Sequence, residues 1–168
     1  MRGGRADYRS GFAPRVKIAI RLGSPRDRAF VHDLADRTVM QSVAAFRNPT
    51  AGSVAQALDR LLEIVEGQSH VALIAEANGR AVGFLLLLDE LPDEVTSTPQ
   101  GFIAYMAVEP QFRRHGIARA LLLAAEDEAR RRSLPYMALM VTEENSGARS
   151  LYERCGYITE RRLLCKAL

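Results

Sequence analysis

The sequence predicts an α/β fold with a mixed, mostly antiparallel sheet of six to seven strands, flanked by about four helices. Apolar segments with a period of two alternate with segments of helical period along the chain. The pair Asn78-Gly79 joins two apolar runs and is typical of a tight β-hairpin. A strand, a helix and a second strand over residues 102–141 predict a central βαβ unit.

The first half of the chain predicts one strand and two helices. Residues 15–22 alternate as a strand does, and Ser24-Pro25 is a helix start signal for the segment up to residue 43. Residues 48–52 break this helix. A second helix follows over residues 53–67, with an apolar face of Val54, Leu58, Leu61, Leu62 and Val65.

The second half predicts the rest of the sheet. Three strands are expected over residues 70–77, 80–90 and 101–108, and the third is apolar enough to be buried on both faces. A long helix from about Ile117 to Arg132, a strand over residues 136–141 and a short helix come next. Residues 157–168 close the sheet with one strand or a pair of strands.

Composition excludes several classes of protein. The hydrophobic fraction of 48% and the charged fraction of 26% are those of a folded domain. No apolar run approaches the roughly 20 residues that span a bilayer, and the N-terminus lacks the apolar core of a signal peptide, so we expect a cytoplasmic protein. Cys155 and Cys165 are too few for a disulfide framework or a metal site, and we expect free thiols and no metal.

The distribution of charge disfavours nucleic acid as a partner. The net charge is +3, but residues 1–28 carry +6 and the other 140 residues carry −3. A phosphate backbone requires basic residues over one folded face. Here the excess begins in a Gly/Arg-rich segment, residues 1–14, which we expect to be a flexible basic tail ahead of one domain over residues 15–168.

The loop before the long helix has the character of an anion site. Arg113, Arg114 and His115 precede Gly116, and the helix starts at Ile117. A helix N-terminus offers about four free N–H groups and a partial positive charge, and glycine lets the backbone approach a ligand closely. No Gly-Lys-Ser/Thr follows, so the loop is not a P-loop. A pyrophosphate held without metal fits the pattern better.

Two motifs in order give this chain its resemblance to a known family. Residues 113–118, Arg-Arg-His-Gly-Ile-Ala, resemble the Q/R-x-x-G-x-G/A motif of the GNAT superfamily of N-acetyltransferases. Residues 145–157 resemble its second signature, N-x-x-A-x-x-L-Y-x-x-x-G-F/Y. The resemblance implies transfer of an acetyl group from acetyl-CoA directly to a primary amine of a small molecule or peptide, without a covalent enzyme intermediate.

The resemblance also assigns roles to residues. Coenzyme A would be bound by Arg113, Arg114, His115, Gly116, Ile117 and Ala118, by the backbone of Met106, Ala107 and Val108, and by Asn145 and Tyr152. Tyr152 would be the general acid that protonates the leaving thiolate. Many relatives carry a glutamate base on the strand that corresponds to residues 101–108, but this strand has none. Glu109 is a candidate base, and Glu143, Glu144 or a water held by Tyr105 are alternatives.

Other functions remain open at this point. A non-catalytic acyl-CoA sensor would keep the anion loop and discard the base. A nucleic-acid-associated protein would rest on the basic tail. Acceptor selection is expected from residues 24–67 and from the loop 89–100, whose four acidic residues suit a cationic amine: Asp89, Glu90, Asp93 and Glu94. A homodimer is compatible with the sequence.

Overall fold

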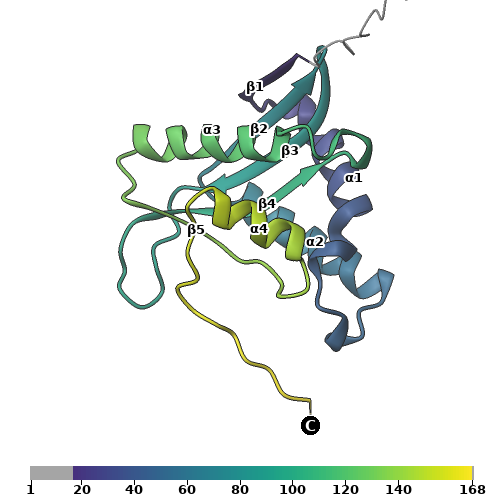
Figure 1. The fold of residues 1–168 in the computed structure, drawn as a ribbon, viewed down its shortest axis with the longest axis vertical. Helices are drawn as coiled ribbons and strands as arrows, with labels where there is room; N and C mark the ends of the chain where they lie inside the picture. The colour runs from purple at the N-terminus through teal and green to yellow at the C-terminus, as the bar shows by residue number, and fades with distance from the viewer. Residues whose placement is uncertain (1–16, 168) are drawn as a thin grey trace, which may run out of the picture.

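Five strands form one mixed sheet in the order of the chain (Figure 1). The structure is a computed structural model that describes residues 17–167. The first four strands run antiparallel to one another and the fifth runs parallel to the fourth: β1 (Ile18–Leu22), β2 (His70–Ala77), β3 (Arg80–Leu88), β4 (Gln100–Val108) and β5 (Tyr136–Leu139). The parallel pair is the strand–helix–strand unit that the sequence predicts.

Four helices cover the two faces of this sheet. They are α1 (Arg28–Thr38), α2 (Ala51–Glu66), α3 (Ile117–Arg131) and α4 (Ser146–Arg154). The first two pack on one face around Phe84 and Leu34, and the other two pack on the opposite face around Leu121 and Leu85. Each face therefore has its own apolar core. No helix within residues 17–167 is long and apolar enough to cross a membrane.

The local signals in the sequence set the hairpin and the helix starts. Asn78 and Gly79 have φ angles of 52° and 81°, the left-handed pair that a two-residue hairpin requires. The second helix begins earlier than predicted, because Thr50 is its N-cap and accepts the Ser53 N–H at 3.1 Å. The segment after Ser24 is divided into a short 3-10 turn (Pro25–Asp27), α1 and a second turn, η2 (Val39–Ser42).

The predicted count of six to seven strands is wrong for the residues that the structure describes, which hold five. Residues 157–167, expected to close the sheet, form no strand. Arg161 pairs instead with Asp93 and Glu94 in the loop after β3, and the charged run Glu160-Arg161-Arg162 is exposed. The predicted strand over residues 136–141 ends at Leu139. The basic tail, residues 1–14, lies outside the described residues.

A β-bulge in β4 lies at the point where β4 and β5 separate. Leu86 pairs with Tyr105 and Leu87 with Ile103, so Ala104 is an extra residue on this strand. The pairing of β4 with β5 ends at the same point, at Ile103 and Leu139. Residues 105–108 therefore pair with β3 alone, and we call their other side the open edge of β4. The strand was expected to be buried on both faces; none of its residues is exposed, but five are only half-buried.

Candidate functional site

The open edge of β4 presents unpaired backbone N–H groups. Glu109 donates its N–H to the Val82 carbonyl on β3 at 2.8 Å. Successive N–H groups of a strand point to opposite sides, so those of Val108 and Met106 point away from β3. The Val108 carbonyl also lies on that side, where it accepts the Arg113 Nε–H at 3.2 Å. Two N–H groups thus face the place where β5 has separated from β4.

The loop from Glu109 to Gly116 joins this edge to α3 through an unusual backbone. It begins with the 3-10 turn η4 (Pro110–Phe112). Arg114 and Gly116 both have left-handed φ angles, of 67° and 80°. A Cβ built on Gly116 would have no atom within 4 Å, so open space lies in front of this residue. Glycine is required here by the backbone conformation and not by crowding.

The start of α3 leaves a row of donors free. The first intrahelical bond runs from the Ala120 N–H to the Gly116 carbonyl at 3.0 Å. The N–H groups of residues 116–119 have no hydrogen-bond acceptor among the described residues. Four such donors at the positive end of a helix of 15 residues have the geometry and the partial charge that suit an anion. The sequence predicted this arrangement.

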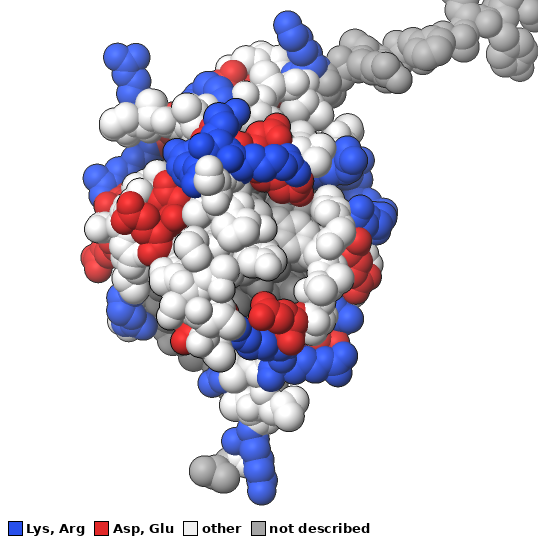
Figure 2. Space-filling model, turned by 90° about the vertical axis from the view of Figure 1, so that its left-hand side faces the viewer, with Lys and Arg blue, Asp and Glu red and all other residues white. Residues whose placement is uncertain are grey.

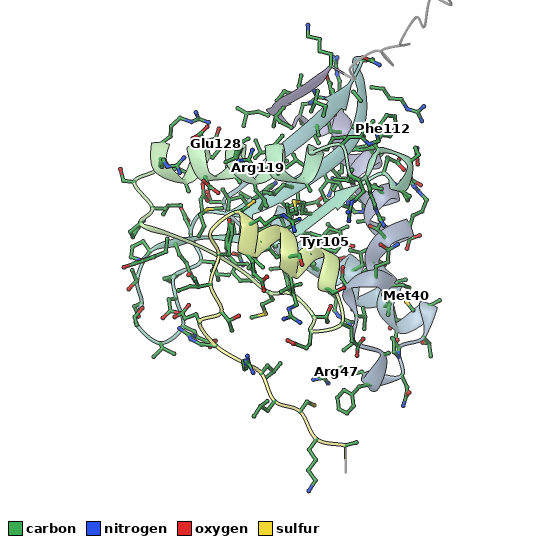
Figure 3. The ribbon with its side chains drawn as sticks, viewed as in Figure 1. Met40, Arg47, Tyr105, Phe112, Arg119 and Glu128 are labelled. Carbon is green, nitrogen blue, oxygen red and sulfur yellow. The ribbon has the colours of Figure 1, made fainter. Side chains whose placement is uncertain are left out.

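The side chains of the loop place positive charge around the free N–H groups and make few contacts with the rest of the protein. Arg113 is half-buried and is tied to the end of β4, so it braces the loop. The His115 Nδ1 lies 2.8 Å from the Arg113 carbonyl, which fixes its ring over the turn. Arg114 and Arg119 are exposed and form no ion pair in the described structure. Figure 3 labels Phe112, which lies within the loop, and Arg119, which lies on the first turn of α3.

Tyr152 lies on α4, on the same face of the sheet as α3. Its ring packs against the core that contains Met106 and Ile117, and its edge meets Tyr157 with 5.8 Å between ring centroids. Burial raises the pKa of the Tyr152 phenol above its usual value of 10.0. No hydrogen bond of its hydroxyl is found among the described residues. The group therefore holds a proton across the neutral range and has a free O–H to donate.

Asn145 is the N-cap of α4 and accepts the Ala148 N–H at 3.2 Å. The loop before it also contacts the segment between α1 and α2. Glu144 accepts the Ala45 N–H at 2.9 Å, and the Thr142 hydroxyl donates to the Ser42 carbonyl at 3.3 Å. The carboxyl ends of β4 and β5 lie at one edge of the sheet, and the segment 42–45 approaches it from the α1 and α2 face.

Glu109 is held by an arginine that sequence reasoning missed. Its side chain is 11% exposed, and both carboxylate oxygens accept from Arg37 on α1, at 2.8 and 3.1 Å. Arg37 also pairs with Asp33 one turn earlier in the helix. These carboxylates raise the pKa of Arg37, so the cation is permanent. The i, i+4 spacing of Asp33 and Arg37 was visible in the sequence, but the longer contact had no local signal.

Tyr105 points to the opposite face from Tyr152, as a result of the bulge. Ala104 and Tyr105 are consecutive, yet both pack on the α1 and α2 core. The ring of Tyr105 stacks on Phe84 with centroids 5.9 Å apart, and its hydroxyl lies 3.4 Å from that of Thr38. Burial raises its pKa. Figure 3 labels Tyr105 where α4 overlaps it in this view and Met40 on η2, the turn after α1.

The acidic loop after β3 is largely neutralised by arginines. Asp89 pairs with Arg132 at 2.8 Å at the end of α3, and Arg161 pairs with Asp93 and Glu94. Figure 2 shows acidic and basic groups interspersed on the face that carries this loop, without a continuous basic surface.

No group of three or more potential metal ligands occurs within residues 17–167. The prediction that no metal takes part stays a prediction.

Comparison with known proteins gives the same fold and a family. The chain resembles a Pyrococcus furiosus protein assigned provisionally as an acetyl transferase, with a TM-score of 0.78, 21% identity, and 90% of this chain and 100% of that chain covered. It also resembles a ribosomal-protein-alanine N-acetyltransferase from Brucella melitensis biovar Abortus 2308 (TM-score 0.66, 22% identity, 90% and 99% covered). An aminoglycoside N-acetyltransferase in complex with CoA has a TM-score of 0.66 and 19% identity over 94% of this chain and 99% of its own.

Sequence comparison with curated proteins gave no significant match. The family assignment rests on a different finding, which covers both motifs and the open edge of β4. The model of the acetyltransferase (GNAT) family matches residues 40–157, more than half of the chain. The resemblance expected from the sequence is therefore confirmed, and the chain belongs to the GNAT family of acetyltransferases.

Proposed function

We propose that this protein transfers an acetyl group from acetyl-CoA directly to a primary amine of a small molecule or a peptide. The observation that carries the proposal is the row of four free N–H groups at residues 116–119, placed at the same sheet edge as the N–H groups of Met106 and Val108. The first row suits a pyrophosphate and the second suits a thioester carbonyl. The cytoplasm remains the proposed location.

Coenzyme A fits the donors that the site offers. The backbone of residues 116–118 would hold the pyrophosphate, with Arg113, Arg114 and His115 supplying positive charge around it. The N–H groups along the open edge of β4, at Met106 to Val108, would bind the arm that carries the acyl group, and Asn145 would order the facing loop. When bound, acetyl-CoA supplies an activated acetyl thioester.

The remaining groups would move protons. Backbone N–H groups at Met106 and Val108 would stabilise negative charge on the reacting carbonyl oxygen. Tyr152 would donate its phenolic proton to the leaving sulfur, because its raised pKa keeps the proton in place at neutral pH. Amine attack requires no nucleophile from the protein, and Cys155 and Cys165 carry none of this mechanism.

The general base stays a prediction. Glu109 lies at the end of β4, but both of its carboxylate oxygens accept hydrogen bonds from Arg37, so neither oxygen faces an incoming amine without a partner. We therefore expect Glu109→Gln to keep turnover within about fivefold of wild type and to lower stability by about 1 kcal/mol. A loss of 100-fold or more in turnover, with unchanged affinity for acetyl-CoA, would instead establish Glu109 as the base. Glu143, Glu144 and a water held near Tyr105 are the alternatives.

A non-catalytic acyl-CoA sensor is the second candidate. The lack of a glutamate within β4 and the engaged state of Glu109 are the features that favour it. Titration calorimetry with acetyl-CoA, with ATP and NADH as controls, tests the coenzyme site first. Micromolar, selective binding supports both candidates, and a folded protein that does not bind rules out both. A screen of small amines and peptide N-termini for CoA release then separates enzyme from sensor.

A further inference from the structure

The last peptide group of β4 is held from three directions. The Glu109 N–H donates to the Val82 carbonyl at 2.8 Å, and the Val108 carbonyl accepts the Arg113 Nε–H at 3.2 Å. From α1, Arg37 binds the Glu109 side chain. The Val108 N–H, the proposed donor to the thioester oxygen, belongs to the peptide group just before. These three contacts therefore set where that donor lies.

Beyond Glu109 the sheet no longer restrains the chain. Pro110 has no N–H to donate, and the Phe112 N–H donates back to the Glu109 carbonyl at 2.8 Å, within the turn η4. The strand is thus followed at once by a turn whose hydrogen bonds are local. The side chain of Glu109 ties this junction to a distant part of the chain, because its partner Arg37 lies 72 positions away.

The geometry of the Arg37 contact is restrictive. The guanidinium donates to both Glu109 oxygens, at 2.8 and 3.1 Å, and a planar group that binds both oxygens fixes the direction of the carboxylate as well as its distance. Asp33, one turn earlier, accepts from the Nε and Nη2 atoms of Arg37 and holds its side chain in place. The helix itself is fixed in the core by Leu34 and Ala35, which are fully buried.

We propose that Arg37 is a positioning residue for acetyl transfer, which holds the Glu109 carboxylate so that the Val108 N–H stays directed at the reacting carbonyl. The effect on turnover rests on the proposed function, whereas the effect on the end of β4 does not. Donors to a developing oxyanion must be placed accurately to be effective. The free N–H groups of residues 116–119 belong to α3, which the buried Ile117 fixes in the opposite core, so coenzyme binding should not depend on Arg37.

Arg21 on β1 is a matched control for Arg37. Its guanidinium binds both oxygens of Asp27, at 2.7 and 2.8 Å, and a second carboxylate, Glu76, at 2.7 Å. The side chains of Arg21 and Arg37 are 40% and 42% exposed, and in both cases the carboxylates raise the pKa of the arginine. Strands β2 and β3 separate β1 from β4. Loss of either guanidinium should therefore cost similar stability, but only one loss should reach the site.

The variants Arg37→Met and Arg21→Met remove the guanidinium and keep an unbranched stem. Both should lower the urea midpoint by a similar amount. At conditions where both are fully folded, Arg37→Met should lower kcat by about 30-fold and change the Kd for acetyl-CoA by less than about threefold. Arg21→Met should keep kcat within about twofold of wild type. Equal kcat in the two variants overturns the role of Arg37 in turnover.

A second measurement does not require activity. Amide hydrogen exchange of the Glu109 N–H, followed by NMR, should be about tenfold faster in Arg37→Met and unchanged in Arg21→Met, because the end of β4 is released in the first variant alone. Unchanged exchange in Arg37→Met overturns the proposal. A wild type that acetylates no amine refutes the proposed function and the effect on turnover, and the exchange at Glu109 distinguishes this failure from a wrong placement.

Two further variants separate positioning from other roles. Arg37→Lys keeps the charge and loses the two-point contact, so it should fold as wild type does and have a kcat about fivefold lower; wild-type kcat overturns the proposal. Glu109→Gln keeps a side-chain carbonyl that accepts from Arg37, so its kcat should stay near that of wild type. A loss of 100-fold in Glu109→Gln would assign the effect of Arg37→Met to a base and overturn the positioning role.

Discussion

The two ends of α3 differ in how far their polar groups are satisfied. At the C-terminus, the Arg132 N–H donates to the carbonyls of Glu128 and Ala129, and the buried Glu128 carboxylate pairs with Arg131 and Arg132. Arg132 also reaches Asp89. At the N-terminus, residues 116–119 present N–H groups without acceptors. A native protein rarely leaves donors unpaired unless a ligand or solvent takes them, so we expect the saturated end to be structural and the open end to bind a ligand.

The largest effect on affinity for acetyl-CoA is expected from filling the space at the N-terminus of α3. Gly116→Val places a branched side chain at a φ of 80°, in the empty space over the free N–H groups. We expect affinity for acetyl-CoA to fall by about 100-fold or more in titration calorimetry. Gly52→Ala, on α2, is the control: its Cβ meets no atom within 4 Å and its φ is ordinary, so binding should persist. Full affinity in Gly116→Val would show that the N–H row binds no phosphate.

The second effect separates binding from chemistry. Tyr152→Phe removes the proton donor and should lower turnover by about 100-fold with little change in affinity for acetyl-CoA. Tyr157→Phe is the matched control, because the Tyr157 hydroxyl is buried without a hydrogen-bond partner among the described residues. That variant should be as active as wild type and no less stable. Equal turnover in both variants would refute the assignment of Tyr152 as the acid.

Activity should also depend on pH in a direction that the pKa of Tyr152 sets. A general acid works only while protonated, and burial raises this pKa above 10.0. The alkaline loss of turnover due to Tyr152 should therefore occur above pH 10 and be absent between pH 7 and 9. A rate profile of turnover at saturating substrates measures it. An alkaline limb near pH 8 that persists in Tyr152→Phe would belong to another group.

The smallest effect is expected at the saturated end. Glu128→Gln removes a buried charge between two arginines and should lower the free energy of unfolding by about 1–2 kcal/mol, without changing affinity for acetyl-CoA. The arginines lower the pKa of Glu128 below 4.5, so this contribution is present above pH 4.5 and is lost as the pH falls further. Urea unfolding at pH 7 and pH 3 checks the sign. A binding defect would contradict the division between the two ends.

The sequence alone predicted the features that depend on local backbone conformation. Gly116, the start of α3 at Ile117 and the Asn78-Gly79 hairpin follow from backbone conformations that few residues adopt. It failed where partners are distant in the chain. The Arg37 and Glu109 pair spans 72 positions, and the bulge at Ala104 depends on register with β3. The expected closing strand failed because strand-like composition does not say which edge is available to pair.

The bulge at Ala104 constrains the length of β4 more than its composition. The donors along the open edge belong to the main chain, so substitutions of the side chains in this segment leave them in place. A change in the number of residues is another matter. Removing one residue at Ala104 would rephase the strand, turning Tyr105 and Ala107 toward α3 and Met106 and Val108 toward α1. Substitutions in this segment therefore leave the backbone donors in place, whereas a deletion would change which side chains face α3 and which face α1.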